Sequence, residues 1–433
     1  MLIALLITTM VFIFLHLLFK LNGVPFVGRY AHPLGLFIAI QVCVFSLPGV
    51  IMISFLSFPS ERYTGIKFNS LYDIGLWYIY SLCVLLVIIF FCISVFKPSS
   101  YKDALYNTEF LDHRWRVCRI ITIISLLLIF VQIIFFAKPP VLYLINGQPE
   151  EAYLVRVAMQ NDPSRYYPPF IRSFLIFFTT FQAYYVYYIY NRLKNKNWGV
   201  YFVLIISIIV AIFQSLYEAQ KAPLIMLFIG LIFIRYIFKP KIISTVFYVL
   251  LLIVVSVILV SSLLDIDINS AIEGVISRTF LGQNQGFYNI IEHIKPNSKY
   301  WFQDFYFAGT LGLNPSRADI DVIPYIYDNR DDVVNVNSYF LGQAWSMFGT
   351  LGLGISPIIV GLAISFYIIV LDRLIKYDVC VFLPYFIYFV PGIMLNQSFT
   401  YFLYGKYFLL GLFNVFVFFL IVRFLNVNKL VMR

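Results

Sequence analysis

Residues 74–96 read IGLWYIYSLCVLLVIIFFCISVF, a stretch without a charged side chain. A helix that crosses the hydrocarbon core of a bilayer needs about 20 mostly apolar residues, so this stretch can span a membrane. Similar apolar runs recur near 1–19, 35–57, 118–137, 173–190, 199–216, 222–238, 242–264, 347–371, 379–395 and 406–425. We therefore predict an all-α integral membrane protein with about 11 transmembrane helices.

The composition excludes a soluble protein of this length. Of the 433 residues, 61% are hydrophobic and only 12% are charged, whereas about 25% of the residues in a typical soluble domain are charged. The chain has too few charged side chains to cover a water-exposed surface. The first apolar run lacks a basic region before it and a small-residue cleavage site after it, so we expect an anchor rather than a signal peptide.

The distribution of Lys and Arg predicts the orientation, because cytoplasmic connections are enriched in both residues. When the connections are taken alternately and the two long ones are set aside, 18 Lys and Arg residues fall in one set and four in the other. The basic set is predicted to be cytoplasmic, which places the N-terminus outside and the C-terminus inside. The net charge of +10 follows from this topology and does not indicate a nucleic-acid partner.

Two long connections on the outer side are expected to hold the functional residues. They exceed the length of simple turns, and binding residues commonly lie on loops that a rigid scaffold supports. With them the chain has five regions: 1–137 (helices 1–4), 138–172 (first loop), 173–264 (helices 5–8), 265–346 (second loop) and 347–433 (helices 9–11 and a tail). Helical patterns within the loops occur at 150–160, 270–281 and 287–294.

Cationic residues on or beside these loops indicate an anionic ligand, because guanidinium groups bind phosphates through two hydrogen bonds. The candidates are Arg156, Arg165, Arg172, Lys221, Arg278 and Arg317. For each loop arginine the alternative is an ion pair with a nearby carboxylate, and for Lys221 it is a pair with Glu218. Glu292 or His293 is a candidate general base, with no role as the alternative for a surface histidine.

Other patterns favour neither a metal site nor a familiar hydrolase. The two Asp-x-Asp strings, Asp265/Asp267 and Asp319/Asp321, are weak signals for a divalent cation, and we expect no metal. The chain contains no P-loop, HExxH or GxSxG motif, which argues against an ATP-driven pump, a zinc metalloprotease or a serine hydrolase. Most of the 33 tyrosines are assigned to belts at the membrane interface.

The chain resembles the O-antigen polymerases, also called oligosaccharide repeat-unit polymerases of the Wzy type. The stretch Gly342-Gln-Ala-Trp-Ser-Met-Phe-Gly-Thr-Leu-Gly-Leu-Gly-Ile-Ser-Pro357 looks like that family's entry to a late helix. Lys221 before Ala-Pro-Leu-Ile looks like the basic residue that these proteins carry after a short polar turn. The number of spans, the two large outer loops and the high Phe and Tyr content are similar as well.

The resemblance implies a glycosyltransferase of the bacterial inner membrane that acts on the periplasmic side. Donor and acceptor would be oligosaccharides linked to undecaprenyl pyrophosphate, with membrane lipid and a chain-length regulator protein as further partners and no cofactor. The six cationic candidates would bind the pyrophosphate, and Glu292 or His293 would deprotonate the acceptor hydroxyl. Tyr300, Trp301 and Tyr306 would line a sugar-binding groove, since aromatic rings present an apolar face and a polar handle.

Two alternatives stay open at the level of sequence. A flippase for the same lipid-linked oligosaccharide would show repeats and charged residues within its spans, whereas nearly every charge here lies at a span end or in a loop. A ligase or another membrane glycosyltransferase of the same pathway would share the loops and the anionic lipid donor.

Overall fold

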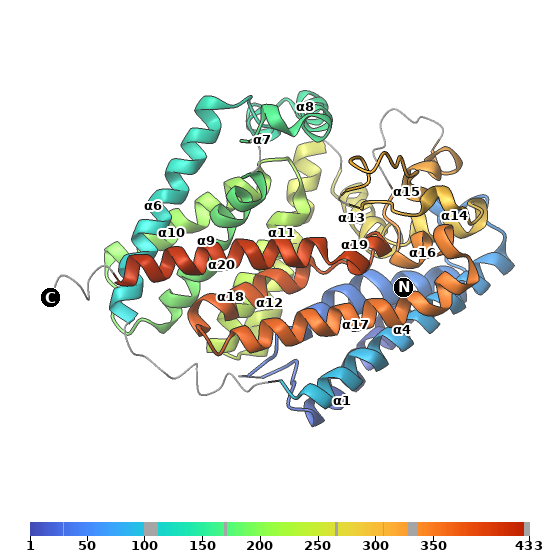
Figure 1. Cartoon of the computed structure of the whole chain (residues 1–433), viewed down its shortest axis with the longest axis horizontal. Coiled ribbons are helices and arrows are strands. Elements are labelled where there is room, and N and C mark those ends of the chain that lie inside the picture. The colour runs from blue at the N-terminus through green and yellow to red at the C-terminus, as the bar shows by residue number, and fades with distance from the viewer. Residues whose placement is uncertain are drawn as a thin grey trace.

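The computed structural model describes residues 1–28, 30–98, 111–168, 171–264, 267–305, 307–327 and 336–427. Within these ranges the regular secondary structure is entirely helical. Figure 1 shows long helices packed as a bundle, with short helices gathered toward one side of it. The chain is an all-α, multi-pass membrane protein, as predicted.

Eight helical segments of the described residues are long and apolar enough to cross a bilayer. They are α1 (Leu2–Leu21), the run Leu34–Phe55, α4 (Phe68–Phe96), α6 (Leu111–Phe135), α10 (Trp198–Leu216), α11 (Lys221–Phe238), α17 (Thr350–Leu374) and α20 (Lys406–Val427). Two further apolar helices are α12 (Ile242–Leu264) and α18 (Val379–Phe389), whose qualifying stretches are shorter. Each of these helices overlaps a predicted span.

The one predicted span not yet described, at 173–190, corresponds to α9 (Arg172–Arg192). This helix lies at the centre of the bundle. It packs against α6, α10, α11, α18 and α20, and most of its residues are buried. Its Gln182 donates a hydrogen bond to the Ser207 carbonyl of α10 at 2.7 Å. Because neighbouring helices surround α9, it tolerates tyrosine, threonine and glutamine where a lipid-facing helix would not.

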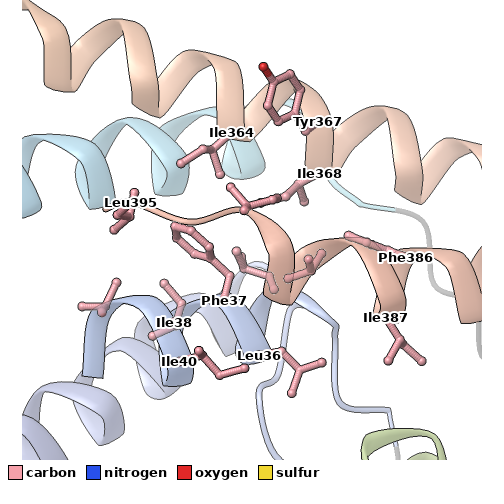
Figure 2. Packing of buried hydrophobic residues seen from close by; sticks show 14 of the residues in the cluster. Leu36, Phe37, Ile38, Ile40, Ile364, Tyr367, Ile368, Phe386, Ile387 and Leu395 are labelled. Carbon is pink, nitrogen blue, oxygen red and sulfur yellow. The ribbon is translucent and has the colours of Figure 1, made fainter. Parts of the chain in front are cut away.

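The helical run Leu34–Phe55 consists of α2 (Leu34–Phe37), η1 (Ile38–Ser46), α3 (Leu47–Val50) and η2 (Ile51–Phe55). Figure 2 shows Phe37 and Ile38 facing Ile364 of α17, with Leu395 beside them. Gln41 donates to the Pro391 carbonyl at 3.2 Å and accepts from the Leu395 amide at 3.1 Å. This buried side chain therefore ties the segment after α18 to the N-terminal part of the bundle.

The short helices lie in the segments that connect the long helices along the chain, and they include every helix predicted for the loops. They are η3 (Glu61–Tyr63), α7 (Pro140–Ile145), α8 (Pro149–Asn161), η4 (Pro163–Arg165), α13 (Ile268–Ile276), η5 (Ser277–Leu281), α14 (Gln285–His293), η6 (Ser298–Tyr300), α15 (Ala318–Asp321), η7 (Ile323–Tyr325), α16 (Phe340–Phe348), η8 (Val390–Gly392) and α19 (Phe399–Tyr404). The helical predictions at 150–160, 270–281 and 287–294 are confirmed. We call the side of the bundle that carries α7, α8 and α13–α16 the loop face (Figure 1).

One prediction about the spans is corrected. The late span does not begin at residue 347, because Gly349 has φ of +62° and separates α16 from α17. A backbone in this left-handed region favours glycine and interrupts a helix. Ten of the 33 tyrosines are fully buried inside the protein: Tyr78, Tyr167, Tyr184, Tyr185, Tyr188, Tyr217, Tyr288, Tyr300, Tyr339 and Tyr385.

Candidate functional site

Lys221 is the first residue of α11 and is exposed on the loop face. The predicted alternative, a pair with Glu218, is wrong, because Glu218 binds Arg172 at 2.8 Å instead. Glu218 also accepts a hydrogen bond from the Tyr167 hydroxyl at 3.0 Å. Lys221 has no ion-pair partner among the described residues, and the charge of Arg278 acts on its ammonium group.

Arg278 lies in η5, the π-helical turn that continues α13, and its side chain is exposed. Arg62 approaches the same turn and donates to the Ser277 hydroxyl at 3.0 Å and to the Gln285 amide oxygen at 3.1 Å. We call Arg62, Lys221 and Arg278 the cationic cluster. Its three members come from distant parts of the sequence, and within the described part of the chain none of them forms an ion pair with a carboxylate.

The turn that carries Arg278 is held by buried polar contacts. The Tyr63 hydroxyl donates to the Leu281 carbonyl at 2.6 Å, and the Tyr78 hydroxyl donates to the Asn284 amide oxygen at 2.8 Å. Gly49 packs so closely that an added Cβ would lie 1.9 Å from the Phe280 carbonyl oxygen. The backbone beside Arg278 is therefore fixed, which keeps a flexible cationic side chain close to one position.

The other cationic candidates have carboxylate partners or lie elsewhere. Arg172 pairs with Glu218 as described, Arg165 pairs with Asp162 at 3.0 Å, and Arg317 pairs with Asp319 at 2.7 Å. The Arg165 pair is largely solvent-exposed, with 75% of the Arg165 side chain accessible, so it contributes little. Arg156 is half-buried on α8 without an ion pair in the described ranges.

Glu292 and His293 lie at the end of α14 that is remote from the cationic cluster. Arg62 contacts Gln285 at the start of this helix, and eight residues of helical rise place His293 about 12 Å further along. The His293 ring stacks on Tyr325 with centroids 4.7 Å apart. Both rings line a cavity of about 700 Å³. The predicted general bases therefore do not lie beside the cationic cluster.

The predicted sugar-binding residues differ in their exposure. Tyr300 lines the same cavity, but its ring is only 2% exposed and its hydroxyl donates to Asp321 at 2.9 Å. Trp301 is 44% exposed, and its indole N–H donates to the Met347 carbonyl at 2.8 Å. Trp301 therefore presents a ring face at the surface while one edge is anchored. Tyr306 lies outside the described residues.

The acidic strings face protein donors. Asp267 caps α13 by accepting from the amides of Asn269 and Ser270, Asp319 binds Arg317, and Asp321 binds Lys299 at 2.8 Å. The hydrogen bond to Asp321 raises the pKa of Lys299. Asp265 lies outside the described residues. Asp319 and Asp321 are therefore each paired with a cationic side chain of the protein.

A comparison with known protein families, curated proteins and solved structures finds no match. Sequence reasoning missed Arg62, which stands in a short connection and looks like one more basic flank of a span. It also missed Asn284, because a buried amide within a Gly-rich turn has no charge or periodicity to mark it. Arg62 and Asn284 become candidate residues of the functional site only through their contacts with the turn that carries Arg278.

Proposed function

We propose that the protein is a membrane glycosyltransferase that polymerises oligosaccharide repeat units carried on a polyprenyl pyrophosphate. The observation that carries this proposal is the cationic cluster of Arg62, Lys221 and Arg278. These side chains lie at one face of a membrane protein, and two of them repel each other rather than pairing with carboxylates. An anionic ligand would offset this repulsion. The resemblance to the repeat-unit polymerases supports the same substrate.

The arrangement suits a pyrophosphate on a lipid. Arg62 and Arg278 offer planar guanidinium groups, which match phosphate oxygens bidentately. Lys221 opens α11 at the boundary of a membrane span, and the positive end of that helix adds to the local potential. A pyrophosphate at the end of a polyprenyl chain would reach this depth with its lipid still in the bilayer.

The proposed reaction transfers a glycan to a hydroxyl group. The acceptor oxygen forms a bond to the anomeric carbon of the donor, and the bond from that carbon to the pyrophosphate oxygen breaks. The pyrophosphate leaves with the electron pair, while the proton of the acceptor hydroxyl passes to a base, for which Glu292 and His293 stay our predictions. Cations placed where charge develops contribute about 3–4 kcal/mol each in favourable cases.

The loop face is assigned to the periplasm in this proposal, with the N-terminus periplasmic, the C-terminus cytoplasmic and the protein in the bacterial inner membrane. The excess of Lys and Arg in the opposite set of connections supports the assignment. On this side the donor arrives already activated, so neither a nucleotide nor a cofactor is required.

The distribution of buried charge favours an enzyme over a flippase. Among the described residues the buried Lys, Arg, Asp and Glu side chains are Arg192 and Asp372. Arg192 is the last residue of α9, and Asp372 lies in the last turn of α17. A transporter that moves an anionic glycolipid would be expected to place charged groups near the middle of its spans.

Deletion of the gene in its host tests the proposal. Surface polysaccharide separated on a gel should show a single repeat unit in place of the wild-type ladder. Loss of a flippase or a ligase would leave no repeat unit at all, and an unchanged ladder would contradict all three functions. Complementation with Arg278→Ala or Lys221→Ala should fail to restore the ladder at normal membrane levels. The matched control is Lys67→Ala, an exposed lysine in the same connection as Arg62.

A further inference from the structure

A second, smaller cavity of about 110 Å³ lies between α14, α16, α19 and the segment that precedes α19. Side-chain amides dominate its polar lining, and we call it the amide-lined pocket. Its main polar residues are Gln303, Asn337, Gln343, Asn396, Gln397 and Tyr401. Water occupies about 30 Å³ per molecule in the liquid. The pocket therefore has room for a few waters, or for one edge of a sugar ring.

The lining contains buried polar atoms without partners. Gln303 is 1% exposed, and its Nε2 donates to Asp319 at 3.3 Å. Its carbonyl Oε1 has no hydrogen-bond partner among the described residues, and the same holds for Oδ1 of Asn396. These two oxygens have almost no accessible surface, so a ligand would meet the other polar groups of the lining. Among them, the half-buried Gln397 amide forms no hydrogen bond in the described residues and is available to a ligand with hydroxyl groups.

The charge of the pocket indicates that this ligand is uncharged. Arg317 and Asp319 both line it, and they neutralise each other at 2.7 Å. What is left consists of amides and hydroxyls, which both donate and accept hydrogen bonds. Sugar hydroxyls also do both, whereas a phosphate only accepts. The pocket therefore differs in chemistry from the cationic cluster.

One side chain connects the pocket to the cationic cluster. The Gln283 carbonyl oxygen accepts from the amide groups of Asn337 and Asn396, both of which line the pocket. The Gln283 amide nitrogen donates to the backbone carbonyl of Arg278 at 3.2 Å. The wall of the pocket is therefore joined through Gln283 to the turn that carries Arg278.

We infer that the amide-lined pocket binds one uncharged sugar residue of the substrate through its hydroxyl groups. The inference rests on the proposed function, because it takes the sugar to be part of a lipid-linked oligosaccharide. The pocket selects the sugar, and the cationic cluster binds the pyrophosphate. The two sites contribute separately to binding.

The test measures the binding of two probes to the purified full-length protein in lipid nanodiscs. The first probe is the repeat-unit oligosaccharide released by mild acid from the host's lipid-linked pool, which carries neither lipid nor pyrophosphate. The second is undecaprenyl pyrophosphate, which carries no sugar. Gln397→Ala is the primary variant, because the Gln397 side chain forms no hydrogen bond in the described residues and its removal breaks no internal contact.

Gln397→Ala should weaken binding of the free oligosaccharide by up to about tenfold, the loss expected for one hydrogen bond, and should leave binding of undecaprenyl pyrophosphate unchanged. Gln303→Met, which keeps the side-chain length, should act in the same direction. Arg278→Ala should give the reverse pattern. The matched control is Asn269→Ala, which removes an exposed amide of α13 outside the pocket.

Two failures are distinguishable. If the free oligosaccharide does not bind the wild type, or binds both pocket variants as tightly as the wild type, the cavity only holds water and the inference is overturned. If undecaprenyl pyrophosphate does not bind, or binds Arg278→Ala unchanged while the pocket variants still lose the oligosaccharide, the proposed function fails and the sugar site stands.

Discussion

Replacement of Arg278 by alanine should remove function without removing stability. The Arg278 side chain is exposed, forms no hydrogen bond or ion pair within the described residues, and lies where its charge repels Lys221. The substitution therefore deletes a repulsion and no attraction. We expect the melting temperature of purified Arg278→Ala to equal or slightly exceed that of the wild type.

The loss of activity can be bounded from the exposure of the side chain. Two unit charges 4 Å apart interact by about 1 kcal/mol in water and by about 4 kcal/mol at an effective dielectric constant of 20. Because Arg278 is exposed at the loop face, an intermediate value of about 1.5–3 kcal/mol applies to the departing pyrophosphate. At 1.36 kcal/mol for each factor of ten, elongation should slow by about 10- to 150-fold.

The assay is the initial rate of glycan elongation by the protein in nanodiscs, with the melting temperature measured on the same samples. Arg278→Lys keeps the charge without the guanidinium fork and should fall between the wild type and alanine. Lys67→Ala controls for loss of one positive charge at this face. An Arg278→Ala protein that elongates at the wild-type rate would refute the role of the cluster. A melting temperature several degrees lower would refute the reasoning from repulsion.

Three further predictions concern the framework of the site. Glu218→Ala removes the carboxylate that binds Arg172 at 2.8 Å and should lower the free energy of unfolding by about 1–2 kcal/mol; an unchanged melting temperature would contradict this. Gly49→Ala forces a Cβ against the Phe280 carbonyl, so it should lower the free energy of unfolding by about 1–3 kcal/mol and slow elongation. Wild-type stability and a wild-type elongation rate would contradict the close contact between Gly49 and Phe280. Hydrogen bonds within the cap of α13 hold the pKa of Asp267 below its ordinary value, so the cap is complete above the ordinary carboxyl range and weakens as pH falls through the lowered pKa. The protection factors for hydrogen exchange in α13, which are corrected for the intrinsic pH dependence, should therefore fall in acid, and Asp267→Asn should abolish that fall; a variant that keeps it would argue against the cap.

The membrane spans were predictable because each is an unbroken apolar run of sufficient length, and the lipid alone imposes that pattern. The break at Gly349 was not predictable from the sequence, because Gly342–Pro357 looks like one apolar entry to a helix. Only the backbone angle at Gly349 shows that there are two helices. The ten buried tyrosines could not be told apart in the sequence for a related reason. A tyrosine between helices and one at the membrane interface occur in the same kind of sequence.

The candidate site was predictable only where charge marked it. Lys221 and Arg278 were selected as cations beside the loops, and in the folded chain the charge of one acts on the other. Arg172 was selected by the same rule, yet its carboxylate partner Glu218 stands 46 positions further along the chain. No pattern in the sequence marked the amides of the pocket, because Gln303 and Asn396 are uncharged and line the same cavity only in the folded chain.

The most direct test of the central claim is elongation by the protein alone. Purified protein in nanodiscs would be incubated with lipid-linked single repeat units extracted from the deletion strain, and the products would be measured by mass spectrometry. We expect glycans of two or more repeat units, with one undecaprenyl pyrophosphate released for each new linkage. Single repeat units that persist unchanged on their lipid would contradict it.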